Sequence, residues 1–379
     1  MTSVQASDAL GLLRQLAVIP APSHHEERRA TFVRDWLRAA GATHMEIDDV
    51  KNVVCQLGPA DVDRFVVFSA HTDVVFPDTD PLPLHEDAEK IYAPGVGDDT
   101  ANLCALLLAT RELIAHPEAL PRSCGVLVVA NSCEEGLGNL DGTKALYRRY
   151  AGQIVEHVAF DLYLPQCISC AVGSHRYRIT CHTQGGHSLR DYGRPNAIEV
   201  LCNLVEDLYG NGRPWGAEPF PDDEGATQNV GVISGGTSVN AIPAEASMLY
   251  EYRSASELML QNLASRLRGT IQKHSHFDGT LELQCIGERP GNGRVDQVAL
   301  EALAARAGEV ITRVTGQEPD QSPASTDVNV PLSLGIPAVC VGAVRGGLLH
   351  TRDEWVEKAS LEDGCRVAHD IMFGELARL

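Results

Sequence analysis

The chain has 379 residues, with 31 Lys+Arg against 51 Asp+Glu and a formal net charge of -20. This acidic balance argues against nucleic acid and other polyanionic partners, because phosphate binding draws its affinity from basic patches. The length exceeds that of one ordinary core and predicts two or three structural units, one of which can be inserted into another.

Targeting signals and cysteines predict the compartment. No stretch reaches the ~18 apolar residues that span a bilayer, and the amino terminus lacks a basic segment followed by a long apolar one. Eleven cysteines are scattered from Cys55 to Cys365 without a repeating framework, which suits reduced thiols. The CxxC from Cys167 to Cys170 has no second CxxC or CxxH, and we interpret it as structural. We therefore expect a soluble, cytoplasmic protein.

The first part of the chain predicts an α/β layer with a mixed, mostly parallel sheet. Apolar residues recur at helical spacing over residues 9–18 and 24–41, where Gly41 is placed to end the second helix. Buried strands are expected at residues 52–58, 64–70, 125–132 and 157–165. An apolar helix at residues 101–117 separates the second strand from the third, so the order strand, helix, strand recurs.

From about residue 174 the pattern changes to β-α-β-β-α-β, the order of a ferredoxin-like domain. Its elements are expected, in chain order, at residues 175–183, 195–210, 227–236, 246–254, 256–274 and 279–287. The α/β pattern then returns, with a helix from Val295 to Thr315, an apolar strand at residues 336–344 and a last helix near Leu361 to Leu379. We therefore expect one domain made of residues 1–173 and 289–379, interrupted by an inserted domain of residues 174–288.

His71 and Asp73 close the second predicted strand, in the sequence FSAHTDVV. Polar residues at the carboxyl end of a strand lie where ligands bind in open α/β sheets. Residues two apart share a face, so the Asp73 carboxylate could accept the His71 ring proton and leave the other ring nitrogen free for a metal. The alternative is that the two side chains only satisfy each other at a loop mouth.

Acidic residues recur at or after the ends of the other strands. Asp98 and Asp99 lie in a glycine-rich turn before a long helix, where either could face a cation or cap the helix, and for Asp99 the cap is favoured. Glu134 and Glu135 stand side by side past a strand, which is costly unless a cation neutralises one of them or the loop is solvated. Asp161 lies inside an apolar run and needs a partner, which a metal would supply.

His350 is the last such position, again after an apolar run and glycines. Two imidazoles and three carboxylates form a ligand set that suits two zinc ions sharing one carboxylate. The set is His71, Asp98, Glu135, Asp161 and His350. Glu134 is then left over, and a free carboxylate beside a metal-bound water is what a hydrolase needs as general base.

Five motifs together resemble those of a known family. In order, AHTDVV, GVGDDTAN, SCEEGLG, FDLYLP and LLHTRDEW resemble the metal motifs of the M20 family of metallopeptidases, which includes peptidase T, dipeptidases, carboxypeptidases and acylamino-acid deacylases. The resemblance covers essentially the whole chain, since that family carries its lid or dimerisation domain where the insertion stands. It implies a zinc-peptidase-like catalytic domain, two Zn2+ per chain with Co2+ or Mn2+ as alternatives, and a homodimer formed through the inserted domain.

By this resemblance Asp98 would bridge two ions, one completed by His71 and Asp161. Glu135 and His350 would complete the other. Asp73 would orient His71, and Glu134 would take the proton of the bridging water and pass it to the leaving amine.

The inserted domain also carries residues that match the family's lid. The segment GGHSLRDYGRPNAI resembles the one whose His reaches the partner's active site, which implies that His187 is an oxyanion donor; a surface His is the alternative. Asn240 and Arg253 match lid positions near the substrate, although an Arg paired within the sheet is the alternative for the second.

Two departures from the family bear on the substrate. Thr100 and Ala101 replace the usual Lys and Gly, which removes a local positive charge. Asp161 resembles the ligand of the aminopeptidase and dipeptidase branch, where carboxypeptidases and deacylases usually have Glu. The expected function is a dinuclear zinc exopeptidase that cuts di- or tripeptides from the N-terminus. The alternatives are an N-acyl amino acid amidohydrolase of the same family and a non-catalytic binding homologue, against which the intact Glu134 argues.

Overall fold

The computed structural model describes residues 6–59, 61–210 and 225–378, and the chain divides into two compact units. Unit 1 comprises Met1–Ala171 with Arg294–Leu379, and unit 2 comprises Val172–Gly293. Unit 2 is therefore an insertion between two segments that fold together. The sequence analysis expected the inserted domain at residues 174–288.

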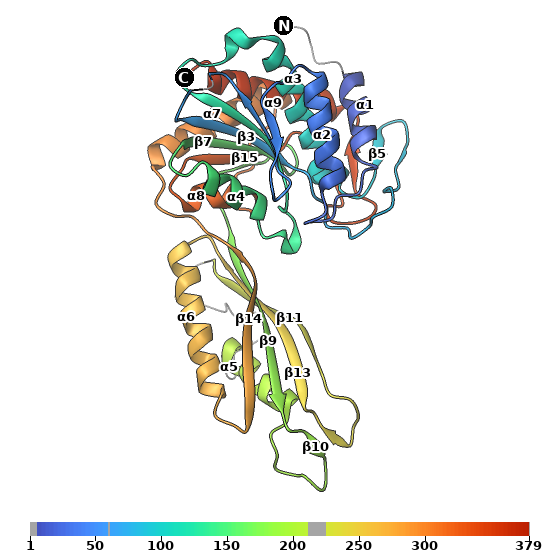
Figure 1. Cartoon of the computed structure of the whole chain (residues 1–379), viewed down its shortest axis with the longest axis vertical. Helices are drawn as coiled ribbons and strands as arrows, with labels where there is room; N and C mark the ends of the chain where they lie inside the picture. The colour runs from blue at the N-terminus through green and yellow to red at the C-terminus, as the bar shows by residue number, and fades with distance from the viewer. Residues whose placement is uncertain (1–5, 60, 211–224, 379) are drawn as a thin grey trace. The chain divides into compact units, whose positions relative to one another are not determined.

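Unit 1 is built on a seven-stranded mixed sheet in the order β1-β2-β6-β3-β7-β15-β8 (Figure 1). Its strands are β1 (Met45–Ile47), β2 (Val53–Leu57), β3 (Phe65–His71), β6 (Gly125–Asn131), β7 (Ile154–Phe160), β8 (Cys167–Ile168) and β15 (Ala338–Val341). The four strands β6, β3, β7 and β15 are parallel neighbours, while β2 and β8 join them antiparallel at either side. β15 follows unit 2 in the chain, yet it lies between β7 and β8. The predicted mixed, mostly parallel sheet is confirmed.

Helices cover both faces of this sheet because its central strands are apolar on both faces. One layer contains α1 (Ala6–Leu16), α2 (Glu27–Ala39), α3 (Asn102–Ala115), α7 (Gln297–Thr315) and α9 (Ser360–Leu376). The other contains α4 (Asp141–Arg149) and α8 (Asn329–Ser333). Alternation along β3 divides the two cores, since Val66 and Phe68 pack with the first layer and Phe65 and Val67 with the second.

A small second sheet of unit 1 has the order β16-β17-β5-β4. Its strands are β4 (His85–Glu86), β5 (Lys90–Tyr92), β16 (Gly346–Gly347) and β17 (Trp355–Glu357). The loop 348–354 connects β16 to β17 and carries His350. Short helical turns lie at Val96–Ala101, Pro117–Ala119 and Gly136–Gly138. The first of these turns precedes α3 and carries Asp98.

Unit 2 is a four-stranded antiparallel sheet packed against two helices. In chain order its elements are β9 (Gly173–Thr183), α5 (Ala197–Tyr209), β11 (Thr227–Gly235), β13 (Glu245–Ser254), α6 (Glu257–His274) and β14 (Gly279–Arg289). The strands lie in the order β11-β13-β9-β14, so β11 and β14 form the edges. A separate two-stranded pair joins β10 (Gly186–His187) to β12 (Ala241–Ile242). This is the predicted ferredoxin-like arrangement.

The prediction that Asp99 caps the following helix is wrong. α3 has Ala101 at its N-cap position, without a side-chain cap hydrogen bond. The Asp99 carboxylate instead accepts the backbone N–H of His71 at 2.7 Å. The ladder between β3 and β7 ends at Ser69, so the buried amide of His71 needs another acceptor and Asp99 supplies it.

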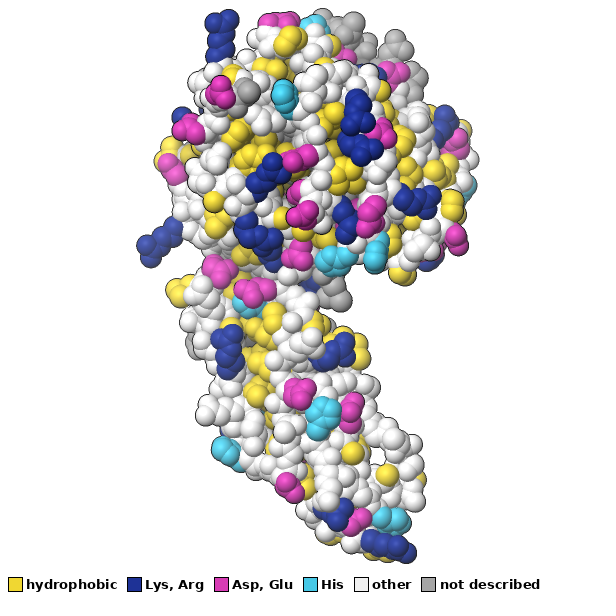
Figure 2. Space-filling model, in the orientation of Figure 1, with side chains coloured by type: hydrophobic (Ala, Val, Ile, Leu, Met, Phe, Trp, Pro, Cys, Tyr) yellow, Lys and Arg dark blue, Asp and Glu magenta, His cyan; other side chains and the backbone are white. Residues whose placement is uncertain are grey.

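The surface charge, the cysteines and the apolarity of the helices can also be compared with the expectations from the sequence. On the face shown in Figure 2, Lys and Arg are interspersed with Asp and Glu over both units, and the described residues there form no extended basic surface for a polyanion. None of the eleven cysteines, all of which lie in the described part of the chain, forms a disulfide. Cys167 packs into the core of unit 1, as expected of a structural residue. None of the helices in the described part of the chain combines the length and apolarity that a bilayer crossing requires.

Candidate metal centre

The chemically active residues predicted in unit 1 converge at one edge of its sheet. His71 is the last residue of β3, Asp161 follows β7 directly, and Glu134 and Glu135 follow β6. Because these three strands are parallel neighbours, their carboxyl ends meet at the same edge. The turn before α3 and the loop 348–354 add Asp98 and His350 to this edge.

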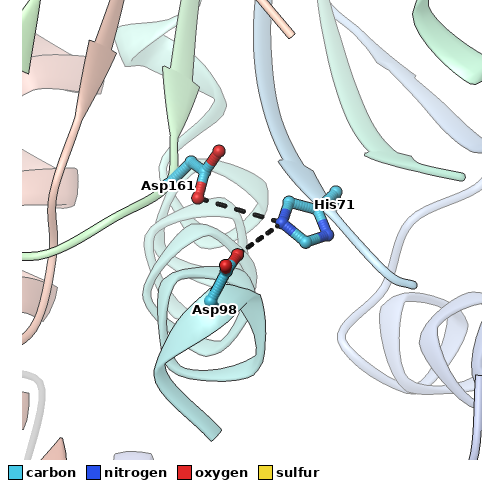
Figure 3. Close-up of side chains that lie close together, drawn as sticks. All are labelled: His71, Asp98 and Asp161. Carbon is cyan, nitrogen blue, oxygen red and sulfur yellow. Dashed lines mark hydrogen bonds and ion pairs between the residues drawn. The ribbon is translucent and has the colours of Figure 1, made fainter. Parts of the chain in front are cut away.

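Three of these residues form what we call the inner group: His71, Asp98 and Asp161 (Figure 3). His71 Nε2 lies 2.9 Å from Asp98 Oδ1 and 3.8 Å from Asp161 Oδ1. All three side chains are buried, and their candidate ligand atoms lie within 4.8 Å of one another. One imidazole nitrogen and two carboxylates therefore face a common point.

An outer group consists of Asp98, Glu135 and His350. His350 Nε2 lies 3.0 Å from Asp98 Oδ2 and 3.3 Å from Glu135 Oε1. The side chain of His350 is 50% exposed, whereas the two carboxylates are buried. Asp98 turns one oxygen to each histidine, so one carboxylate is shared between the two groups.

Asp73 joins the end of β3 to the loop that carries Glu134 and Glu135. Its Oδ1 accepts the N–H of Glu134 and its Oδ2 that of Glu135, both at 2.9 Å, while the Ser23 hydroxyl donates to Oδ2 at 2.6 Å. His71 Nδ1 lies 3.1 Å from the backbone oxygen of Asp73 and 3.5 Å from its carboxylate. Nδ1 therefore lies closer to the carbonyl of Asp73 than to its carboxylate, and that carboxylate also holds the glutamate loop. A third group brings Glu134 and Glu135 together with His71.

The carboxylates of this edge repel one another. Burial and then repulsion from Asp98 raise the pKa of Asp161 to about 8. The same two causes raise the pKa of Glu135. For Asp98, burial opposes the charged form, but hydrogen bonds to His350 and His71 outweigh it and lower the pKa.

The two histidines respond in the opposite sense. Hydrogen bonds to Asp98 and Glu135 raise the pKa of His350 to about 10. Burial disfavours the imidazolium of His71, yet the attraction of Asp99 and the other nearby carboxylates raises its pKa well above the ordinary value. Positive charge is thus strongly stabilised at this edge.

The donor set fits divalent cations. Apart from the contact with His350 Nε2 at 3.3 Å, the buried Glu135 Oε1 has no hydrogen-bond donor among the described residues, although a buried carboxylate oxygen is costly without a donor or a cation. Imidazole nitrogen and carboxylate oxygen are ligands that zinc, cobalt and manganese accept. A cation in each group would also offset the repulsion that raises the pKa of Asp161.

Sequence reasoning missed two buried polar residues beside these groups, Glu354 and Asn102. Each contacts backbone of the ligand-bearing segments. One signal was available for each, since Glu354 directly precedes an apolar strand and Asn102 opens an apolar helix. A charged or amide side chain at such a position needs partners within the fold.

Two of the three residues predicted in unit 2 lie at the strand pair of β10 and β12. His187 is exposed in β10; its N–H donates to Asp191 at 2.8 Å and its Nδ1 accepts the Leu189 N–H at 3.2 Å. The backbone oxygen of Asn240 accepts the N–H of Ser188 at 3.0 Å. The structure therefore brings His187 and Asn240 together.

Arg253 does not join them. It lies near the far end of β13, opposite Ser174 of β9, where the chain enters unit 2. Its Nε donates to Glu251 at 3.1 Å. Pairing within the sheet, the alternative considered from the sequence, is the arrangement observed.

Known proteins resemble this chain over most of its length. The sequence model of peptidase family M20/M25/M40 matches residues 67–373. A succinyl-diaminopimelate desuccinylase of Methylibium petroleiphilum is 26% identical over 321 residues, which cover 78% of each chain. A tripeptidase of Staphylococcus aureus has a TM-score of 0.78 at 19% identity and is covered completely, as is this chain. A dinuclear-metal-binding M20 peptidase of Bacillus subtilis has a TM-score of 0.67 at 15% identity, with 99% of both chains covered. These two structures share the fold.

Proposed function

Because the chain belongs to peptidase family M20/M25/M40 and is therefore a hydrolase, we propose that it is a dinuclear metal-dependent exopeptidase acting on di- or tripeptides, most simply from the N-terminus. The observation that carries the proposal is the sharing of Asp98 by two groups of ligand atoms, with Glu134 beside them. A binding protein has no need of an extra carboxylate at that position.

We assign His71, Asp98 and Asp161 to one ion and Asp98, Glu135 and His350 to the other. Zn2+ suits the mixed nitrogen and oxygen donors, and Co2+ or Mn2+ could replace it. Two such ions supply Lewis acidity, which polarises a scissile carbonyl and lowers the pKa of a water molecule.

The residues of the chain itself would handle protons and charge. Glu134 accepts the proton of the attacking water and returns it to the leaving amine, which needs only one carboxylate within hydrogen-bond reach of both. Asp73 keeps that carboxylate in place, because it holds the backbone N–H of Glu134 and of Glu135 at 2.9 Å. We further propose that His187 donates a hydrogen bond to the developing oxyanion, and that Asn240 and Arg253 contribute to substrate binding.

A second candidate, cleavage of an acyl group from an amino acid, is favoured by the curated relatives. The desuccinylase of Methylibium petroleiphilum removes succinyl from diaminopimelate according to its name. Asp161 favours the exopeptidase, since the resemblance associates Asp at this ligand with aminopeptidases and dipeptidases. Both reactions hydrolyse an amide and use the same residues, so only the substrate separates them.

One experiment tests the activity and the metal together. The purified protein is assayed for metal content and for amino acid release from unblocked tripeptides, unblocked dipeptides, N-acetyl amino acids and N-succinyl-diaminopimelate. About two ions per chain with cleavage of unblocked peptides alone supports the exopeptidase. Activity on blocked substrates alone favours the deacylase. Two ions without any turnover would favour a binding homologue, and no bound ion after reconstitution would overturn the centre.

We also propose a cytoplasmic homodimer formed through unit 2. The edge strand β11 presents Val232 and Ile233, each 51% exposed, and an apolar edge strand is a template for pairing with a second chain. Light scattering at micromolar concentration should report twice the chain mass, and Val232→Lys should shift it toward the monomer. If the wild-type protein has the mass of a single chain, this assembly is rejected.

A further inference from the structure

Glu354 is a fully buried carboxylate outside both groups of ligand atoms. It lies at the end of the loop 348–354, directly before β17, and is 1% exposed. Its Oε1 accepts the backbone N–H of Gly97 at 2.9 Å and that of Asp98 at 2.8 Å. Its Oε2 accepts the N–H of Gly95 at 3.0 Å. Three backbone donors of the turn that carries the shared ligand thus converge on one side chain.

Tyr163 extends this contact to a second ligand-bearing segment. Its hydroxyl donates to Glu354 Oε1 at 2.9 Å, and Tyr163 lies two residues beyond Asp161. The ring lies against two glycines: a Cβ on Gly97 would be 2.4 Å from Tyr163 Cε1, and one on Gly346 would be 2.5 Å from it. The ring can reach Glu354 only because both positions lack a side chain.

Asn102 makes a parallel connection from the other side of the turn. Its Nδ2 donates to the backbone oxygens of Gly97 at 3.1 Å and Leu162 at 2.9 Å. Its Oδ1 accepts the N–H of Ala343 at 2.7 Å. The turn before α3 and the segment after β7 are therefore tied twice, once through Glu354 and Tyr163 and once through Asn102.

We propose that Glu354 is a positioning residue of the metal centre, which holds the segments carrying Asp98, Asp161 and His350 in one arrangement. The inference rests on the proposed function, because it assumes that those three side chains bind the ions. Glu354 belongs to the His350 loop, contacts the backbone of Asp98 itself and reaches the Asp161 segment through Tyr163. It is thus connected to the segments of three of the five proposed ligands, and it contacts Asp98 directly.

The chemistry of the contact requires a carboxylate. Four donors face its two oxygens, and a carboxylate offers acceptors only. A glutamine at this position would turn its NH2 group toward at least one of the backbone N–H groups, whichever way the amide is oriented. Donor would then face donor, and the turn or the loop would have to move.

The test compares Glu354→Gln with Glu375→Gln in the full-length protein. Glu375, in α9, is a matched control because it is also a buried carboxylate with hydrogen-bond donors, at 4% exposure. It accepts hydrogen bonds from Arg306 Nε and Nη2, both at 2.7 Å. Three properties are measured for each variant: the affinity for Zn2+ by chelator competition, the visible spectrum of the Co2+-loaded protein, and the melting temperature without metal.

For Glu354→Gln we expect Zn2+ affinity to fall about tenfold to a hundredfold, as is usual when the partner that orients a ligand is lost. The Co2+ spectrum should change as well. For Glu375→Gln we expect a lower melting temperature with wild-type affinity and spectrum. Wild-type affinity and spectrum in Glu354→Gln, at whatever melting temperature, would overturn the proposal.

A milder variant covers the case in which Glu354→Gln does not fold. Tyr163→Phe keeps the ring and removes one donor, so it should weaken Zn2+ binding in the same direction by about threefold to tenfold. Tyr147→Phe is its control, since that buried hydroxyl contacts His157 at 3.1 Å. If Tyr163→Phe binds Zn2+ as Tyr147→Phe does, the proposal falls.

The same data separate this inference from the proposed function. A wild-type protein that binds no divalent ion contradicts the proposed function, and with it the role of Glu354. A wild-type protein that binds two ions, together with an unaffected Glu354→Gln, contradicts only the positioning role.

Discussion

The predicted site residues of unit 1 and of unit 2 lie in contrasting environments. Unit 1 buries charged side chains such as Asp98, Glu135 and Asp161 at one edge of its sheet, where they repel one another. In unit 2, His187 is exposed in the short strand β10, and Arg253 pairs with Glu251. A buried charge must be stabilised by something specific, whereas an exposed one is stabilised by water. The geometry of unit 1 therefore indicates its ligand, and that of unit 2 leaves the role of its residues to experiment.

The sharpest test of this contrast is Glu134→Ala in unit 1. Turnover should fall by about a thousandfold to ten-thousandfold, because the only assigned proton carrier is lost. Metal content and melting temperature should stay those of the wild type. Glu118→Ala, at a side chain that is 74% exposed, is the control. Steady-state kinetics and metal analysis of both variants test this role. Near-normal turnover of Glu134→Ala would show that Glu134 is not the proton carrier.

Metal removal should lower the melting temperature of unit 1 and leave that of unit 2 nearly unchanged. Saturation at a thousand times Kd stabilises the binding unit by about 4 kcal/mol, or about 10 °C for a unit of this size. Scanning calorimetry with and without a chelator should show that shift in the transition of unit 1 and less than about 1 °C in that of unit 2. Equal shifts in both transitions would mean that the ions stabilise both units alike.

His187→Ala is the corresponding test in unit 2. Loss of one oxyanion donor should lower kcat by about a hundredfold, while the metal content stays unchanged. His182→Ala removes a neighbouring histidine, whose side chain is 40% exposed, and should have little effect on kcat. If both variants retain wild-type kcat, His187 is an ordinary surface residue and unit 2 serves the reaction in another way.

Glu156→Gln is expected to have the smallest effect, on the free energy of unfolding. It removes a buried carboxylate that needs no ion. Burial and the nearby Glu375 raise the pKa of Glu156 to about 7, and Arg306 Nη2 lies 3.4 Å away. The folded state therefore holds this proton more tightly than the unfolded chain does, and the free energy of unfolding falls as pH rises from about 4.5 to about 7.

Glutamine cannot lose that proton, so the variant should be more stable than the wild type by about 1–2 kcal/mol at pH 8 and equal to it near pH 4. Urea unfolding over this pH range measures the difference. A chelator should not change it, since Glu156 belongs to neither group of ligand atoms. A variant less stable than the wild type at pH 8 would show that the contact with Arg306 outweighs the cost of the buried charge.

The sequence predicted the parts of this protein that follow from local pattern. Apolar runs located β3, β6 and β7, and the polar residue at the end of one run and inside another located His71 and Asp161, respectively. The proximity of those residues then followed from the parallel order of the strands. The βαββαβ order of unit 2 could also be predicted, because apolar residues recur with a different period in strands than in amphipathic helices.

What the sequence could not give depends on contacts between distant segments. Asp99 was expected to cap α3, but its carboxylate instead accepts the buried backbone N–H of His71 in β3. Glu354 and Asp98 are separated by more than two hundred residues and meet only in the fold. The carboxylate of Asp73 lies 3.5 Å from His71 Nδ1, but it also accepts hydrogen bonds from Ser23 and from the backbone of the glutamate loop, which the sequence did not predict. Each of these is a choice among donors that tertiary structure alone brings together.

The insertion of unit 2 also constrains how the protein is synthesised. β15 lies between β7 and β8 in the sheet, although all of unit 2 separates it from them in the chain. A ribosome therefore releases β7 and β8 with a vacant position between them, and unit 2 can fold as a unit before unit 1 has its full sheet. His350 emerges later still. During translation, His350 is therefore the last member of the inner and outer groups to be synthesised.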